Sequence, residues 1–143
     1  MIAKSRVLID SNILAYAFDS ADEKKHKAAV TLLTRCWEGQ MRPVVSLQNL
    51  AEFFHIATKK FKKPIPIDEV EEIIEGIIAA PQWEKVAYDS HILQHAMIVA
   101  RINNDFWDAL LISTMIANDI DTIYTENTKD FEIKGIRAVN PFG

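Results

Sequence analysis

Short β-branched runs alternate along the chain with helical stretches, and this alternation is what most constrains the fold. Apolar runs typical of buried strands occupy residues 7–9, 43–46, 86–88, 122–125 and 136–139. Helical periodicity and capping residues predict helices over 13–18, 22–38, 46–60, 66–80, 90–102 and 106–118. We therefore predict an α/β fold with a mostly parallel sheet and helices on both of its faces.

Length and composition limit the class of protein further. The 143 residues suffice for one domain, which we expect to span residues 1–143. The net charge of −4 means that any polyanion must bind to a local basic patch. The lone Cys36 excludes an internal disulfide and a multi-cysteine zinc site. No apolar run approaches the ~20 residues of a membrane span, and the first apolar run is too short for a signal peptide. We therefore expect a cytoplasmic protein.

Three carboxylates lie beside apolar segments, where an unpaired charge is costly. Asp10 ends the first strand, Glu52 lies in the helix after the second strand, and Asp108 lies in the first turn of an apolar helix. Two carboxylates about 4 Å apart repel by roughly 4 kcal/mol at an effective dielectric of about 20. A gathered trio would therefore need a cation between its members. Oxygen ligands favour Mg²⁺ or Mn²⁺, and such ions suit phosphodiester chemistry.

Each of these acids also has an ordinary structural interpretation. Asp10 could begin a turn, and Glu52 could be a solvated helix position. Asp105 could cap a helix whose third residue is Asp108. Whether the three carboxylates meet in space is therefore a question for the structure.

Four segments, in order along the chain, resemble the motifs of the PIN-domain ribonuclease family. They are residues 8–14, 49–53, 106–112 and 124–131. Their order and spacing agree with the family over essentially the whole chain, and the subgroup that the chain resembles is the VapC-type toxins of prokaryotic toxin–antitoxin pairs. The resemblance implies a three-layer α/β/α sandwich with a central, mostly parallel five-stranded sheet. It also implies a Mg²⁺- or Mn²⁺-dependent endoribonuclease, a homodimer and a cognate antitoxin.

The same resemblance assigns roles to particular residues. It implies that Asp10, Glu52 and Asp108 bind the metal ion and are catalytic. Asn12 and Thr125 would support the site by hydrogen bonds. The mechanism that we expect is attack by a metal-activated water on an RNA phosphodiester, which leaves 5′-phosphate and 3′-hydroxyl ends.

The fourth acidic position of the family matches Asn127, which we include among the catalytic residues. Asn carries no charge and is a weaker ligand than a carboxylate. Glu126 or Asp130 could compensate for it, and Asp105 adds a carboxylate that the family pattern does not require. The number of bound metal ions is left open by this departure.

Basic side chains follow the helix that carries Glu52, at positions Lys59, Lys60, Lys62 and Lys63. They could contact RNA phosphates, and binding would then weaken as salt rises. The alternative is a solvated helix end and loop. Three aromatic residues near the acidic motifs could stack on bases, namely Phe53, Phe54 and Trp107. Because apolar residues surround them in the sequence, we expect these aromatics in the core.

Other functions are compatible with the same residues. The chain could be a PIN-like nuclease of RNA processing or DNA metabolism that is not a toxin. The Asn at position 127 would also suit a catalytically degenerate module that only binds metal or RNA. A receiver-like signalling domain is disfavoured, because the second strand ends in Ser46 and carries no phosphoacceptor Asp.

Overall fold

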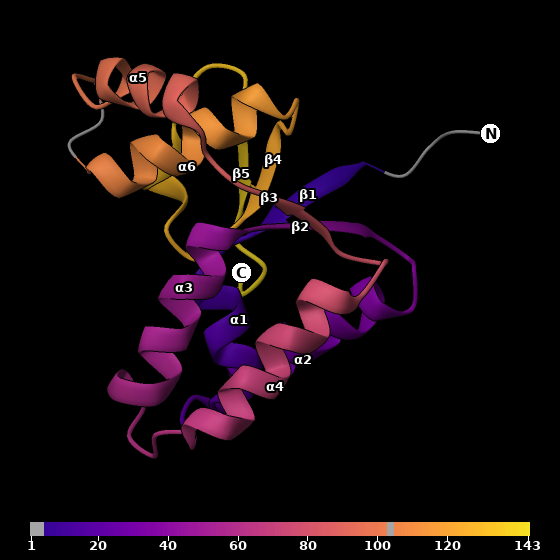
Figure 1. The fold of residues 1–143 in the computed structure, drawn as a ribbon. Helices are drawn as coiled ribbons and strands as arrows, with labels where there is room; N and C mark the ends of the chain where they lie inside the picture. The colour runs from indigo at the N-terminus through magenta and orange to yellow at the C-terminus, as the bar shows by residue number, and fades with distance from the viewer. Residues whose placement is uncertain (1–4, 103–104) are drawn as a thin grey trace.

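A computed structural model describes residues 5–102 and 105–143, in which strands and helices alternate as predicted (Figure 1). The strands are β1 (Arg6–Ile9), β2 (Arg42–Ser46), β3 (Glu84–Val86), β4 (Thr122–Tyr124) and β5 (Arg137–Val139). The α-helices are α1 (Ser11–Phe18), α2 (Glu23–Trp37), α3 (Leu47–His55), α4 (Ile67–Ala79), α5 (Ser90–Val99) and α6 (Phe106–Ala117). Two short helical segments of other types are the π-helix η1 (Ile56–Lys60) and the 3-10 helix η2 (Thr128–Phe131). No helix of the described ranges is both long and apolar enough to cross a membrane.

The five strands form one parallel sheet in the order β3-β2-β1-β4-β5. The central strand is β1, in which Leu8 pairs with Val44 of β2 on one side and with Ile123 of β4 on the other. Along the chain, β2 and β3 are added on one side of β1, and β4 and β5 are then added on its other side. Ligands of parallel sheets bind at such a switch point, beyond the carboxyl ends of the two strands.

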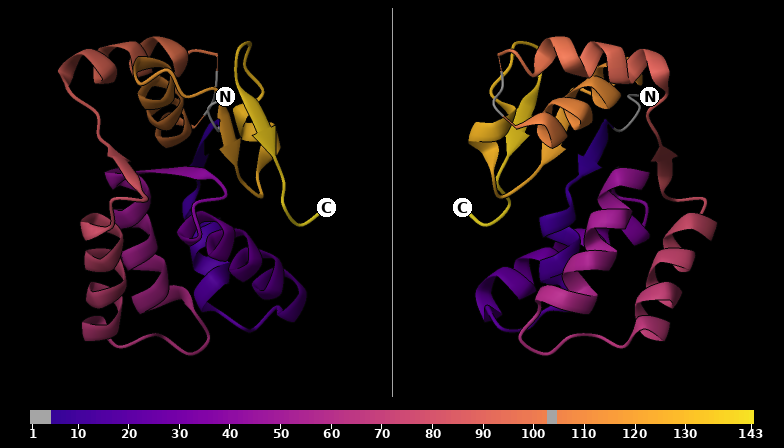
Figure 2. Two further views of the ribbon diagram at one scale, coloured as in Figure 1. Left: turned by 90° about the vertical axis from the view of Figure 1, so that its right-hand side faces the viewer. Right: turned by 60° about the vertical axis from the view of Figure 1, so that its left-hand side comes forward.

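Alternate strand residues supply two separate cores, one on each face of the sheet. Val7 and Ile9 of β1 pack with residues of α1, α2, α3 and α4. Leu8, between them, packs on the opposite face with residues of α6 and with Val99 of α5. Figure 2 shows α1–α4, from indigo to pink, grouped apart from the two orange helices α5 and α6. The predicted layers, with helices on both faces of the sheet, are therefore confirmed.

The structure corrects several predicted boundaries, among them the start of α1, which lies at Ser11 rather than at residue 13. β3 ends at Val86, its last residue paired with β2, and the predicted continuation to Tyr88 is exposed chain beyond the sheet. α5 ends at Val99 rather than at Ile102. The helix after β2 reaches Lys60 as predicted, but its last 5 residues form the π-helix η1.

Candidate active site

Asp10 lies at the switch point of the sheet, where β1 ends and α1 begins. It is 8% exposed, and its Oδ1 accepts a hydrogen bond from the Ser11 backbone N–H at 2.8 Å. Thr125, which follows β4, donates its hydroxyl to Oδ2 at 2.7 Å. Asn49 of α3 donates its side-chain amide to Oδ1 at 3.2 Å. Burial raises the pKa of Asp10, and the hydrogen bonds from Thr125 and Ser11 oppose that rise. One buried carboxylate thus joins three distant parts of the chain.

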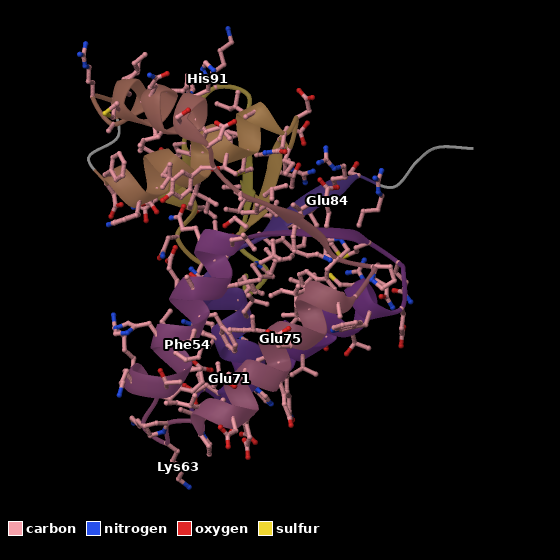
Figure 3. All side chains as sticks on the ribbon, in the orientation of Figure 1. Phe54, Lys63, Glu71, Glu75, Glu84 and His91 are labelled. Atoms are coloured by element: carbon pink, nitrogen blue, oxygen red, sulfur yellow. The ribbon has the colours of Figure 1, made fainter. Side chains whose placement is uncertain are left out.

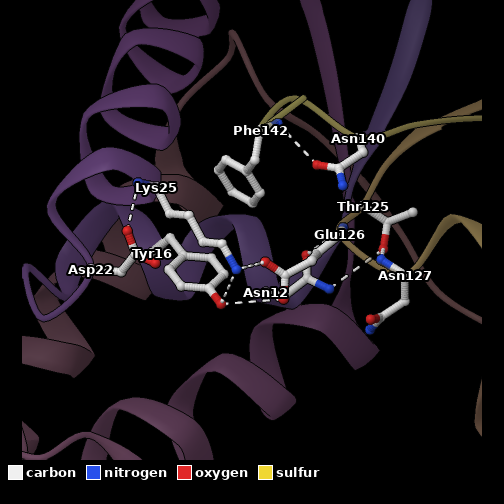
Figure 4. Close-up of polar contacts among 9 residues, drawn as sticks. All are labelled: Asn12, Tyr16, Asp22, Lys25, Thr125, Glu126, Asn127, Asn140 and Phe142. Carbon is white, nitrogen blue, oxygen red and sulfur yellow. Dashed lines mark hydrogen bonds and ion pairs between the residues drawn. The ribbon is translucent and has the colours of Figure 1, made fainter.

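Asn12 and Asn127 lie on either side of Thr125. The Asn12 amide lies 3.4 Å from Thr125 Oγ1 and 3.5 Å from Asp10 Oδ2, and its Oδ1 accepts from the Glu126 N–H at 3.3 Å. The Asn127 N–H donates to Thr125 Oγ1 at 3.1 Å (Figure 4). These contacts fix the loop after β4 against the first turn of α1. The Asn127 side chain itself is exposed.

Glu52 extends from α3 toward the same region. The Ser11 hydroxyl lies 3.3 Å from Glu52 Oε2 and 3.4 Å from Asp10 Oδ1, so it bridges the two acids. Partial loss of solvent raises the pKa of Glu52, and the charges of Asp10 and Asp105 raise it further. Hydrogen bonds from Gln48 and Ser11 act in the opposite direction.

Asp108 is the third carboxylate, at the start of α6. Asp105 caps this helix as predicted, since its Oδ1 accepts from the Asp108 N–H at 3.1 Å. Desolvation raises the pKa of Asp108 to about 7, helped by four neighbouring charges, those of Asp105, Asp130, Asp10 and Glu52. The three carboxylates singled out in the sequence are therefore close enough for their charges to interact. Asp10 can therefore begin a turn, and Asp105 can cap α6, while Asp10 and Asp108 still face a common candidate site.

A cleft of about 600 Å³ opens between α3 and the start of α6. Its lining includes three carboxylates, those of Glu52, Asp105 and Asp108, and the apolar or aromatic side chains of Leu47, Ala51, Tyr88 and Trp107. Trp107 is 61% exposed, so its predicted place in the core is wrong. α6 is buried from Ala109 to Met115, but Trp107 lies on the face that its neighbour α5 leaves open. Phe53 is fully buried, as predicted.

Glu126 is bound on the side of α1 and α2. Its carboxylate lies 2.7 Å from Lys25 Nζ and accepts from the Tyr16 hydroxyl at 3.2 Å, as Figure 4 shows. Lys25 Nζ also lies 5.1 Å from the centroid of the Tyr16 ring and 5.9 Å from that of Phe142. Glu126 thus connects the loop after β4 to α1 and α2.

Asp130, in η2, acts on the carboxylate cluster more directly. Its charge raises the pKa of Asp10 and of Asp108, whereas the Glu126 carboxylate is engaged by Lys25 and Tyr16. Asp130 is therefore an acid near Asn127 whose field reaches the site.

The four lysines predicted to meet RNA are all exposed, at the end of η1 and in the turn that follows. Lys60 lines a hollow of about 250 Å³ together with Asn12 and Tyr16, which places it beside the residues around Asp10. Figure 3 shows Lys63 projecting into solvent at the end of α3 and α4 that is remote from the sheet. Lys60 thus shares a hollow with Asn12, a member of the site's hydrogen-bond network.

Ser11 and Asn49 also hold the Asp10 carboxylate, although no sequence-based prediction assigns either residue a role. Asn49 also completes a capping box on α3, since its N–H donates to Ser46 Oγ at 2.9 Å and its Oδ1 accepts from Ser46 N–H at 3.2 Å. The Ser-x-x-Asn spacing after β2 signals such a box. No sequence signal shows that the remaining amide N–H of Asn49 reaches Asp10.

A family model of the PIN domain matches residues 7–135, and the chain belongs to this family. The matched range contains the switch point, the three carboxylates and the loop after β4. No curated protein matches the chain significantly.

Solved structures of similar fold cover nearly the whole chain. A toxin–antitoxin complex from Klebsiella pneumoniae has 20% identity and a TM-score of 0.63, and the match covers 94% of this chain and 97% of that one. DNA-bound VapBC from Salmonella typhimurium has 18% identity and a TM-score of 0.65, covering 96% and 98%. VapC20 from Mycobacterium tuberculosis, described as a sarcin–ricin loop cleaving toxin, has 13% identity and a TM-score of 0.66, covering 92% and 98%. At such identities the likeness establishes the fold.

Proposed function

We propose that this PIN-domain protein is a metal-dependent endoribonuclease and the toxin of a toxin–antitoxin pair. The observation that carries the proposal is the charge crowding of Asp10, Glu52 and Asp108 beside one cleft. The pKa of each carboxyl is raised, and each is raised in part by the charge of other carboxylates. A folded protein retains such repulsion only where something offsets it, and a divalent cation does so with oxygen ligands.

The donor set fits a hard cation such as Mg²⁺ or Mn²⁺, because all three side chains offer carboxylate oxygens. Within residues 5–102 and 105–143, no three His, Cys, Asp or Glu side chains already converge on one point that could hold a metal. Binding of a cation would therefore draw the three carboxylates inward. We assign Asp10, Glu52 and Asp108 as the residues that would hold it, with Asn127 and Asp130 beside them.

The chain's own residues prepare this site. Thr125, Ser11 and Asn49 hold the Asp10 carboxylate in one orientation. The hydrogen bonds from Thr125 and Ser11 also oppose the rise in the pKa of Asp10 that burial causes. When bound, a divalent ion supplies a Lewis acid that lowers the pKa of water and offsets the charge of a phosphodiester. Hydrolysis by water leaves 5′-phosphate and 3′-hydroxyl ends, whereas attack by the RNA 2′-hydroxyl would leave a cyclic phosphate.

RNA must approach a protein of net charge −4, so local basic groups have to meet its phosphates. The exposed lysines after α3 supply such groups, and Lys60 lines a hollow together with Asn12 of the Asp10 network. The toxin role, the homodimer and the antitoxin partner are proposed on the family membership and on the likeness to solved toxin–antitoxin complexes.

The test uses purified protein and an end-labelled RNA pool with Mg²⁺, Mn²⁺ or EDTA, beside the Asp10→Asn variant. We expect metal-dependent fragments with 5′-phosphates from the wild type and none from the variant. Equal cleavage by both proteins would contradict the proposal, as would cyclic-phosphate ends. The toxin role predicts growth arrest on expression, relieved by the product of a neighbouring gene.

A further inference from the structure

One wall of the active-site cleft is aromatic and apolar, although it borders the carboxylates. Trp107 is 61% exposed, Tyr88 49% and Leu47 48%, and all three line the cleft that Glu52 and Asp108 also line. Large apolar side chains gathered in the open beside a polar site mark a binding surface. None of these three residues has a role in the site described so far.

The aromatic wall is held in place by both sides of the cleft. Gln48 of α3 donates its side-chain amide to the Trp107 carbonyl at 3.0 Å, which ties α3 to the first turn of α6. The Trp107 ring packs against the edge of Phe106, with centroids 5.5 Å apart and an interplanar angle of 73°. Tyr88 lies in the segment between β3 and α5. The two rings are therefore positioned by separate elements rather than by each other.

Charge decides which part of a nucleic acid could lie there. The carboxylates of the cleft repel phosphates, and a phosphate can approach them only where a cation intervenes. The indole and phenol faces offer no charge and suit a flat, uncharged group of similar size. A nucleotide carries both parts, because its phosphate and its base are joined through one sugar. Only an unstacked base has a free face for an aromatic side chain.

We propose that Trp107 and Tyr88 form a base-stacking subsite, which holds one unstacked nucleobase next to the phosphodiester at the carboxylates. The inference rests on the proposed function, since it assigns the substrate's flanking base to the same cleft. Trp107 directly precedes Asp108 in the chain, so the position of a stacked base is coupled to that of the acid. Stacking selects for an exposed base rather than for a particular sequence.

The experiment compares a short fluorescein-labelled oligouridine with an abasic ribose-phosphate oligomer of equal length and charge. Binding is measured by anisotropy in Ca²⁺ buffer. We expect the wild type to bind the oligouridine about tenfold more tightly than the abasic oligomer, the effect of one lost stacked base. Trp107→Ala and Tyr88→Ala should reduce this preference, and Trp107→Phe should keep most of it. Ile98→Ala is the matched control, because Ile98 is also 61% exposed and does not line the cleft.

A second readout separates stacking from a merely structural effect. Oligouridine should quench the tryptophan fluorescence of the wild type, and the quenching should disappear in Trp107→Phe although that variant still binds. An unchanged preference for bases in Trp107→Ala and Tyr88→Ala would overturn the subsite, while metal-dependent cleavage would still support the proposed function. Release of a co-expressed protein by Trp107→Ala, with the base preference intact, would overturn it in favour of a protein contact. A wild type that neither binds nor cleaves RNA in Mn²⁺ would overturn both.

Discussion

The Thr125 hydroxyl donates to the Asp10 carboxylate across the switch point, with an Oγ1–Oδ2 distance of 2.7 Å. Thr125 is fully buried, so water cannot replace this donor. Thr125→Val keeps the shape of the side chain and removes the hydrogen bond. We expect it to weaken Mn²⁺ binding and RNA cleavage by about tenfold or more, the usual cost of losing a group that orients a metal ligand. Isothermal titration with Mn²⁺ measures the first effect, and Thr125→Ser should restore most of it.

The two acids that flank Asn127 should respond differently to neutralisation. Asp130→Asn removes a charge that acts on Asp10 and Asp108, whereas Glu126→Gln removes one already offset by Lys25. We therefore expect Asp130→Asn to reduce Mn²⁺ affinity about tenfold and Glu126→Gln to leave it nearly unchanged. Equal effects in a parallel titration of the two variants would show that this distinction is mistaken.

Asp108 should make the metal-free protein less stable as pH rises. Its pKa is about 7 in the folded chain against an ordinary value of 3.8, and it faces Asp105, Asp130, Asp10 and Glu52. A raised carboxyl pKa contributes stability that is complete below the unfolded value and is lost as pH rises through the folded value. In EDTA, this contribution to the melting temperature should therefore fall between about pH 4 and pH 7. Mn²⁺ should reverse the fall at pH 8, because it binds the folded state.

The control for this pH dependence is Asp108→Asn. The two proteins differ only at this position, so the difference between the two slopes isolates Asp108. The variant in EDTA should show the shallower slope. Parallel melting curves for wild type and variant would rule out the repulsion that we infer.

A phosphate contact made by Lys60 can be distinguished from the general effect of surface charge on RNA binding. Lys60 lines the hollow shared with Asn12, whereas Lys63 projects into solvent at the end of α3 and α4 that is remote from the sheet (Figure 3). We expect Lys60→Gln to lower the slope of log affinity against log salt by about one, since each neutralised phosphate contributes about that much. Lys63→Gln should leave the slope as it is. RNA binding measured over a salt series, with both variants in parallel, makes the comparison.

Neighbouring phenylalanines of α3 should differ in their contribution to stability. Phe53 is fully buried and its ring lies 5.6 Å from that of Phe18, whereas Phe54 is only partly buried. Phe53→Ala should lower the free energy of unfolding by about 3–5 kcal/mol, because it leaves a cavity in the core. Phe54→Ala should cost clearly less. Urea unfolding monitored by circular dichroism tests this, and similar losses for the two variants would be the contrary result.

The fold and the three acids could be predicted because their signals are local. Strand and helix periodicities lie within short windows, and Asp10, Glu52 and Asp108 each interrupt an apolar segment. The order of the strands then brings the acids to one edge of the sheet. The capping role of Asp105 was equally visible, since it depends on a residue only three positions away.

Other features depend on packing between distant segments and leave no local trace. Trp107 follows Phe106 in an apolar helix, and only the arrangement of α5 and α3 around α6 decides that its ring faces the cleft. The ion pair of Lys25 with Glu126 joins α2 to the loop after β4, and the two residues lie 101 positions apart along the chain. Its two residues lie in segments whose separate patterns give no reason to connect them.

The amide of Asn49 has a consequence for which substitutions this position tolerates. Its oxygen accepts from Ser46, and its nitrogen donates to Asp10. Only a side chain with an acceptor and a donor on one short planar group satisfies both contacts. Asp would turn a second carboxylate toward Asp10, Leu would remove both contacts, and Gln would be one methylene too long. A single side chain therefore connects the start of α3 to the orientation of the Asp10 carboxylate. A substitution of Asn49 would disturb the helix cap and the site at the same time.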